Sequence, residues 1–446
     1  MNFEQAREVL VAAAKAEGIS EYEIYYMQGE SMSAETLKDE ISSFSSSVGG
    51  GISFRCISGG NMGYASSELF LEEEMVSLVK RALSNAANMD GDDVPEIFVG
   101  SASYKETSHK APADVSAAEL KRVALELQKK TYAESEYVTD GTQSGAMISK
   151  IDIALSNSYG LELRNSVGMC GTYVQAVVNR EGEAEDEFEF SEGFSAEGCD
   201  GLSAKAVGGA IAKLGACEID SGKYDIIFSG KTMKSMLSAF SSVFSGKSAY
   251  EGLSLLDGKV GEKIASEVIT LVDDPMREGS TMQTSFDGEG VATYKKNVIE
   301  KGVLKTLLYD MATAKKVGGV STGNGQRSSY TSPVSISPYS FYIEGGDKTL
   351  DELVSGVEKG IYITELKGLH AGANAITGDF SIESAGFIIE NGAIGAAVRS
   401  FTVAGNFFEL LSSVEGISNK VDFSIPSLTV FGSPDMLIRQ MSVAGK

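Results

Sequence analysis

One stretch, residues 365–411, restricts the fold of this chain more than any other. Residues 387–389 (Phe-Ile-Ile) form an apolar strand, and the dipeptide Asn391-Gly392 follows directly. A two-residue type I′ turn needs positive φ at both central positions, and Asn and Gly are the residues that accept it. The pattern therefore predicts a tight β-hairpin whose return strand runs to Val403.

A helix is expected directly after this hairpin, opening at Gly405 and Asn406. Asn406 is a suitable N-cap, and Gly416 is expected to end the helix. Its apolar face consists of Phe407, Leu410, Leu411 and Val414.

Residues 368–381, just before the hairpin, are polar and rich in glycine. They include Gly368, His370, Gly372, Asn374, Gly378, Asp379 and Ser381. Such a loop between strands suits a site where a ligand lies close to the backbone. The alternative is a long turn in which Asn and Asp side chains bond the backbone of the turn itself. His370 is the best polar candidate and Asp379 a candidate partner, although a lone imidazole is more often structural than a ligand.

Several runs together resemble the signature of the TldD/PmbA family, a metallopeptidase family also labelled modulator of DNA gyrase. They are NAITGDFS at 374–381, AGF at 385–387, ENG at 390–392 and AGN at 404–406. Further runs resemble the PmbA (TldE) branch: SFDGEGV at 285–291, NVIEKGVL at 297–304 and STGN at 321–324. The resemblance covers most of the chain and is strongest from about residue 261 onward. Asn391, Gly392, Gly405 and Asn406 are its structural signature.

The family's zinc motif has no counterpart here. The resemblance implies that TldD-type chains carry H-E-x-x-x-H on the helix matching residues 231–244 and a cysteine near the C-terminus. This chain has SMLSAFSS at 235–242, its last cysteine is Cys217, and His109 and His370 are its only histidines. We therefore expect no metal site and no catalytic residue in this chain, with zinc only in a TldD-type partner.

The resemblance implies a PmbA/TldE-type subunit of a TldD–PmbA peptidase that acts on unfolded or leader peptides. This chain would bind the peptide, and its cleft candidates are His370, Asn374, Gly378, Asp379 and Ser381. Strand edges beside the glycine-rich loop would accept an extended peptide. The alternatives are a stand-alone homodimeric binding or modulator protein without activity, and an independent metallopeptidase, for which the sequence offers no metal site.

Composition excludes several other functions. Lys and Arg number 38 against 62 Asp and Glu, a net charge of −24, so a direct nucleic-acid partner is not expected, whatever the gyrase label suggests. No apolar run approaches membrane-spanning length, and the N-terminus lacks a signal-peptide pattern. Four scattered cysteines without a CxxC pair favour reduced thiols in the cytoplasm. Gly246-Lys247-Ser248 resembles the end of a P-loop but follows a helix and lacks the earlier glycine.

The fold class expected is α+β, in two domains with mainly antiparallel or mixed sheets, hairpins and packed helices. The boundary is placed near Asp220, giving an N-terminal domain over 1–219 and a β-rich C-terminal domain over 220–446. Capping boxes at Ser116 and Thr349 begin two helices. Residues 183–192 are acidic, and a solvated edge strand is favoured there over a cation site. Other helices are expected over 2–17, 71–87, 202–214 and 231–244. In the N-terminal half, strands are expected over 22–27, 52–56, 62–64, 151–155, 161–163 and 173–178. In the C-terminal half, strands are expected over 224–228, 268–272 and 361–364, and a hairpin over 297–308.

Overall fold

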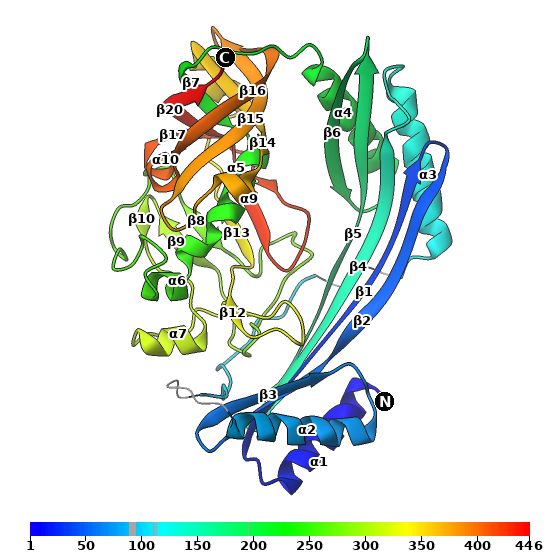
Figure 1. The fold of residues 1–446 in the computed structure, drawn as a ribbon, viewed down its shortest axis with the longest axis vertical. Coiled ribbons are helices and arrows are strands. Elements are labelled where there is room, and N and C mark those ends of the chain that lie inside the picture. The colour runs from blue at the N-terminus through cyan, green and yellow to red at the C-terminus, as the bar shows by residue number, and fades with distance from the viewer. Residues whose placement is uncertain (89–94, 110–111, 113, 195) are drawn as a thin grey trace.

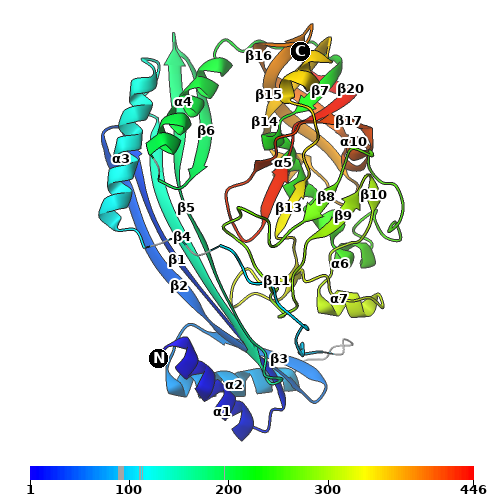
Figure 2. The same cartoon turned by 180° about the vertical axis from the view of Figure 1, so that it is seen from behind.

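The computed structural model describes residues 1–88, 95–109, 112, 114–194 and 196–446. A long, curved sheet runs down one side of the molecule, and the C-terminal elements form a thicker body beside it (Figure 1; Figure 2 from behind). The arrangement is a mixed α+β fold.

The long sheet contains six strands in the order β3-β2-β1-β4-β5-β6, and all neighbours are antiparallel. Its strands are β1 (Glu21–Leu37), β2 (Glu40–Ser58), β3 (Asn61–Ser67), β4 (Gln143–Asn157), β5 (Glu162–Arg180) and β6 (Glu183–Glu192). Strand β3 pairs with β2 only from Ile52 onward. The outer edge of β2 before Ile52 therefore has no strand partner among the described residues.

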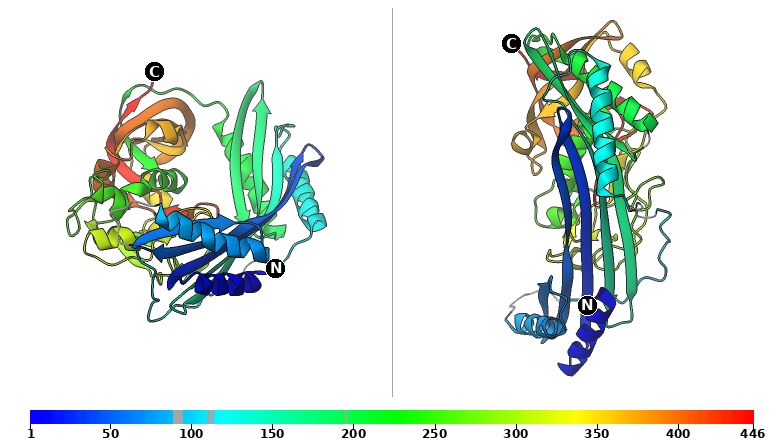
Figure 3. Two further views of the ribbon diagram at one scale, coloured as in Figure 1. Left: turned by 60° about the horizontal axis from the view of Figure 1, so that its bottom comes forward. Right: turned by 90° about the vertical axis from the view of Figure 1, so that its right-hand side faces the viewer.

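Two pairs of helices cover this sheet. Helices α1 (Phe3–Ala16) and α2 (Glu72–Ala87) lie at one end, and α3 (Ala117–Glu134) and α4 (Ala196–Lys213) lie toward the other (Figure 3). Helix α1 opens with a capping box in which Asn2 and Gln5 bond each other's backbone. Helix α2 packs so closely on β3 that a Cβ at Gly63 would collide with the carbonyl oxygen of Ala82.

The C-terminal body contains a second six-stranded sheet in the order β16-β15-β14-β7-β20-β17. These strands are β7 (Gly222–Phe228), β14 (Lys359–Lys367), β15 (Asp379–Glu390), β16 (Ala393–Asn406), β17 (Val414–Ile417) and β20 (Met436–Ala444). Strands β7 and β14 are parallel, and the other pairs are antiparallel. An additional β16–β20 pairing at Thr402↔Ala444 and Val403↔Val443 closes five of the strands into a ring.

A third sheet, in the order β10-β9-β8-β13-β19-β18, lies below this ring in Figure 1. Its strands are β8 (Leu271–Asp273), β9 (Lys296–Glu300), β10 (Val303–Leu304), β13 (Ser340–Ile343), β18 (Asp422–Phe423) and β19 (Val430–Ser433), and β11 (Gly325–Gln326) pairs with β12 (Ser335–Ile336). The helices of this body are α5 (Gly230–Phe240), α6 (Gly246–Tyr250), α7 (Met311–Lys316), α8 (Leu350–Ser355), α9 (Leu369–Gly372) and α10 (Phe407–Ser413), and a 3₁₀ turn, Ser241–Phe244, follows α5.

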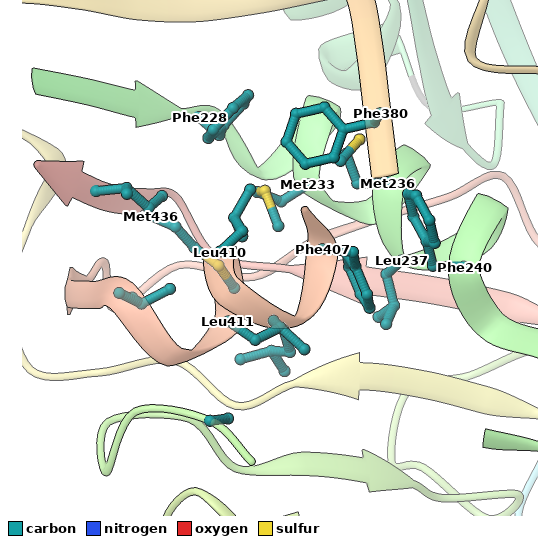
Figure 4. Packing of buried hydrophobic residues seen from close by; sticks show 14 of the residues in the cluster. Phe228, Met233, Met236, Leu237, Phe240, Phe380, Phe407, Leu410, Leu411 and Met436 are labelled. Carbon is teal, nitrogen blue, oxygen red and sulfur yellow. The ribbon is translucent and has the colours of Figure 1, made fainter. Parts of the chain in front are cut away.

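The largest apolar core lies between α5, α10 and the surrounding strands (Figure 4). The rings of Phe240 on α5 and Phe407 on α10 stack with centroids 4.5 Å apart and planes 7° apart. Both side chains are fully buried. The two helices are thus joined by two stacked aromatic side chains.

The hairpin and its helix match the sequence expectation, with one correction. Glu390 pairs with Ala393, and Asn391 and Gly392 take φ of 51° and 77°, as the two-residue turn requires. Asn406 caps α10 by accepting from the amides of Phe408 and Glu409. Gly416 does not end this helix: α10 ends at Ser413, and Gly416 lies in β17.

Other expectations differ in detail. The capping box at Thr349 is complete, whereas at Ser116 only the bond from the Glu119 amide forms, because the Glu119 carboxylate pairs with Arg122. Residues 162–163 and 173–178 belong to one long strand, β5, Leu161 lies just before it, and 183–192 is the edge strand β6. The Gly246-Lys247-Ser248 segment lies in the short helix α6. The boundary expected near Asp220 falls between α4 and β7, and the division into two domains stays a prediction.

Candidate functional site

Residues 368–378 connect β14 to β15 in a compact turn, and residues 379–381 begin β15. Gly368, with φ of 76°, opens the short helix α9, which carries His370. The side-chain oxygen of Asn374 accepts from the amides of Ile376 and Thr377. The amide of Asn374 also donates to the carbonyl oxygen of Asp379 at 2.8 Å. Asn374 thus organises the turn through both its side chain and its backbone.

Asp379 and Asn406 join this turn to the start of α10. Asn406 Nδ2 donates to Asp379 Oδ1 at 2.9 Å and to the carbonyl oxygen of Thr377 at 2.8 Å. Two hydrogen bonds lower the pKa of Asp379. The bond from Asn406 has the larger effect and the bond from Thr377 the smaller one. Gly378 has φ of 84°, and a Cβ there would lie 2.7 Å from the ring of Phe408. Three of the cleft candidates, Asn374, Gly378 and Asp379, therefore lie in one polar turn that is bonded to the signature residue Asn406.

His370 and Ser381 are not brought into that network. Both side chains are exposed, and Ser381 lies on β15 opposite Ala404. The carboxylate of Asp379 bonds Asn406, and no bond to His370 is recorded among the described residues. The assignment of these five residues to a peptide cleft stays a prediction.

A cavity of about 640 Å³ lies elsewhere, between the long sheet and the C-terminal body. One wall comes from β6 and α4, and the other from the start of α5, strand β14 and residues 418–425. Phe188 and Phe190 on β6 supply apolar surface, and Lys205, Lys213, Lys231, Lys234 and Lys420 supply positive charge. Glu187, Glu189, Asp422 and Asp435 line the same cavity, and four of the five lysines are ion-paired with carboxylates of this set.

Lysines bind the outer edge of β6 inside this cleft. Lys213 and Lys231 both pair with the carboxylate of Glu187. Lys213 Nζ also donates to the carbonyl oxygen of Asp186 at 2.7 Å, and Lys231 Nζ to that of Phe188 at 3.4 Å. Burial alone would raise the pKa of Glu187, but Lys231 and Lys213 outweigh it, so the pKa is lowered. The edge of β6 is thus protected by cations, as in natural edge strands.

At the N-terminus of α5, a protein carboxylate accepts a hydrogen bond from a free backbone amide. The Gly230 amide donates to Asp435 Oδ1 at 3.0 Å, and Ser418 Oγ donates to Asp435 Oδ2 at 2.8 Å. Toward the cleft, α5 contributes Gly230, Lys231 and Lys234, without a histidine or carboxylate. Within the described ranges, no group of three or more His, Cys, Asp or Glu side chains is arranged to hold a metal ion. The donors present do not fit a zinc site, and no reaction step is assigned to a metal in this chain.

A buried charge cluster lies where the long sheet meets the C-terminal body. Glu23 on β1 is fully buried and accepts from Arg55 at 2.7 Å and from Arg327 at 2.5 Å. Asp287 and Glu289 lie nearby and are also buried. Asp287 accepts from the amides of Glu289, Val291 and Gly325, each at 2.9 Å.

Two of these carboxyl groups have raised pKa values. Burial raises the pKa of Glu289, and the neighbouring charge of Asp287 raises it further. Burial also raises the pKa of Asp287, against the effect of its three amide donors. In the run SFDGEGV, at 285–291, Asp287 and Glu289 alternate with glycines, and this alternation is the sequence signal for a buried pair of acids.

Two family models match this chain. Residues 221–445, half of the chain, match the PmbA/TldA metallopeptidase C-terminal domain, and residues 22–86 match domain 1 of the same metallopeptidases. The chain belongs to the PmbA/TldD family. The matched C-terminal region contains the turn over 368–381, the Asn391-Gly392 hairpin and one wall of the cleft.

Curated relatives match either most of the chain or a part of it. A metalloprotease of Methanocaldococcus jannaschii is 25% identical over 405 residues, which span 87% of this chain and 88% of that protein. Metalloprotease PmbA of Escherichia coli O157:H7 is 32% identical over 163 residues, 36% of this chain and 33% of that protein.

Solved structures of similar proteins share the fold. TldE from Thermococcus kodakarensis superposes with a TM-score of 0.86 at 25% identity, covering 99% of this chain and all of that one. A candidate modulator of a DNA gyrase from Thermotoga maritima gives a TM-score of 0.89 at 26% identity, with the same coverage. In the described part of the chain, no helix combines the length and apolar character needed to cross a membrane.

Proposed function

We propose that this chain is the zinc-free, peptide-binding subunit of a two-chain PmbA/TldD peptidase, of the PmbA/TldE type. A TldD-type partner supplies the zinc and the catalytic residues, and this chain supplies part of the surface that holds the substrate. The observation that carries the proposal is α5, the helix that matches the family's zinc helix. It presents Lys231 and Lys234 to the cleft where a zinc site needs histidine and carboxylate.

The substrate class we propose is an unfolded or leader peptide. The cleft, at about 640 Å³, has the size of sites that enclose several groups of a ligand. Charged groups of a peptide can exchange with the lysine–carboxylate pairs that line the cleft, and Phe188 and Phe190 suit apolar side chains. The cleft candidates on the turn over 368–381 lie on the same C-terminal body and complete the proposed peptide surface.

The proposed location is the cytoplasm. All four cysteines are free in this structure, and Cys56 and Cys199 are buried. A net charge of −24 supports a protein or peptide partner and opposes direct binding to nucleic acid.

Reconstitution with a TldD-type chain tests the proposal. We expect a heterodimer in size-exclusion chromatography that cleaves an unfolded peptide, and neither chain alone should do so. A homodimer that does not bind the TldD-type chain would instead support a stand-alone binding or modulator protein.

The turn over 368–381 is tested in the same assay. His370→Ala and Asp379→Ala should leave the Tm nearly unchanged while the heterodimer loses cleavage. If the turn is only structural, Asp379→Ala should lower the Tm, and cleavage should fall only with the folded fraction. Glu383→Ala, at an exposed position of β15 outside the set of cleft candidates, serves as a surface control for His370→Ala and separates a local effect from a general one.

A further inference from the structure

The outer edge of β2 before Ile52 is an unpaired strand edge with a definable hydrogen-bonding pattern. Gly59 and Gly60 turn β2 into β3, and Ser58 and Asn61 form the pair that closes this turn. Alternate residues of an antiparallel strand direct both N–H and C=O to the same side, so the even-numbered residues of β2 face the β3 side. Phe44, Ser46 and Val48 continue this series beyond the end of β3 and point their backbone groups outward.

This edge lacks the protection that β6 has. Residues 41–51, read Ile-Ser-Ser-Phe-Ser-Ser-Ser-Val-Gly-Gly-Gly, contain no charged residue and no proline. The two lysines that bind carbonyl oxygens of β6 have no recorded equivalent along β2 in the described structure. Long uncharged edges that are left open are templates for another strand.

A pocket of about 310 Å³ borders the same stretch of β2. Met32, Val115 and Ile148 supply its apolar surface, and Ser46 and Val48 form the side next to the open edge. The Val48 side chain is 69% exposed. Glu30 and the ion pair of Asp114 with Lys150 complete the lining and leave one excess negative charge.

We propose that the open edge of β2 binds a short extended peptide as a seventh strand. Backbone bonds form along Phe44, Ser46 and Val48, an apolar side chain enters the pocket, and a neighbouring Lys or Arg of the peptide lies near Glu30. An edge that offers backbone bonds beside a side-chain pocket is the arrangement by which strand addition gains both affinity and specificity. The site rests on the proposed function only in taking a peptide as the ligand.

The length of the edge favours a short peptide over a second copy of this chain. Strand β3 occupies the edge from Ile52, where it pairs through Ser67. An incoming strand can therefore extend over only about ten residues of β2, taking one residue per strand position. The β1–β2 hairpin of a second copy would direct its tip into β3, whereas a peptide ends before it.

The binding experiment uses a short dansyl-labelled peptide of alternating threonine and lysine with one central leucine. We expect Ser46→Pro to weaken its binding about tenfold, because proline removes one outward N–H and obstructs the edge, a loss of about 1.4 kcal/mol. Ser46→Ala, which keeps the N–H, should bind like the parent. A peptide N-methylated at alternate residues should lose affinity for the parent protein to the same extent.

The pocket and the charge are tested separately. Val48→Ser should weaken binding because it removes apolar surface from the pocket, whereas Ser45→Ala, whose side chain lies on the opposite face of β2, should change it little. Replacing the peptide's lysines by glutamates, or its leucine by glycine, should also weaken binding. A photo-crosslinker at the leucine position should label residues 44–48 in peptide mass spectra.

Two results would overturn this site. Equal affinity of the parent and Ser46→Pro proteins would exclude strand addition at β2. Self-association that Ser46→Pro abolishes, without any effect on the peptide, would assign the edge to a second copy. Failure of the heterodimer to form or cleave would contradict the proposed function and leave the peptide-binding measurement on the single chain unaffected.

Discussion

At the scale of single residues, the hairpin at Asn391-Gly392 shows how strongly two positions determine a local structure. Both residues take positive φ, and β15 and β16 leave the turn in register. Asn406 has a comparable role at the other end of β16, where it caps α10 and bonds Asp379. These residues determine where strands turn and where a helix begins, and they do so through backbone geometry.

We predict that Gly392→Val destabilises the protein by about 1–3 kcal/mol, because a β-branched residue resists the φ of 77° that the turn requires. The added Cβ would also lie 3.0 Å from the carbonyl oxygen of Ser355. Urea unfolding measures the change. Asn391→Gly, which accepts the same φ, is the control and should unfold near the parent midpoint; equal stability of both variants would contradict the argument.

A second prediction concerns the buried carboxyl group of Glu289. Its folded-state pKa is raised, so its contribution to stability is present below the unfolded pKa of about 4.3 and is lost as pH rises through the folded pKa. Glu289→Gln removes the charge and keeps an oxygen acceptor for the Met311 amide. We expect the variant to gain stability relative to the parent as pH rises from about 4.3 to about 8, and to gain no more above the folded pKa.

Thermal unfolding across that pH range measures the effect. Glu289→Ala also removes the charge but leaves the Met311 amide, now bonded at 2.8 Å, without its acceptor, so it should be less stable than Glu289→Gln at every pH. Parallel pH profiles of the parent and Glu289→Gln would show that Glu289 keeps an ordinary pKa.

At the scale of secondary-structure elements, α10 joins the signature region to the main core. We predict that Phe407→Ala destabilises the protein by about 3–5 kcal/mol, because the ring is fully buried against Phe240 and its removal leaves a cavity. Phe408→Ala, at a partly exposed position on the same helix, should cost clearly less. Guanidinium unfolding of both variants gives the comparison. Similar losses of stability would contradict the prediction that the buried ring of Phe407 contributes more than that of Phe408.

Elements with local signals were predictable, and their partners were not. The hairpin at Asn391-Gly392, the helix from Asn406 and the capping box at Thr349 depend on residues a few positions apart, and all three occur. The full length of β5 was missed because its middle alternates irregularly. The cleft was also missed, since it depends on Lys213 and Lys231 meeting Glu187 from segments distant in sequence. No local pattern specifies such a meeting.

At the scale of the whole molecule, charge and cysteine usage were readable from composition, but the shape was not. The ion pair of Lys231 with Glu187 and the bonds of Glu23 with Arg327 join the long sheet to the C-terminal body at two separate places. These connections fix the position of one wall of the cleft relative to the other. They come from side chains whose partners lie far apart in sequence.

We predict that the purified chain binds no stoichiometric zinc. Cysteine and histidine are the ligands that structural zinc sites prefer, and neither occurs at positions 231–244 or after Cys217, apart from His370. Metal analysis by mass spectrometry of protein purified without chelators measures the content, with a TldD-type chain prepared identically as the positive control. About one tightly held zinc per chain would contradict the prediction and require a site outside these segments.

The ring of strands in the C-terminal body has a consequence for synthesis on the ribosome. Strand β7 pairs with β14 and β20, which are translated more than 130 and 200 residues later, respectively. The nascent chain therefore carries β7 without either neighbour while most of the intervening sequence is being made. Unpaired strand edges of this kind promote aggregation, so the emerging chain depends on shielding, by chaperones or by early helices such as α5, until β20 completes the ring.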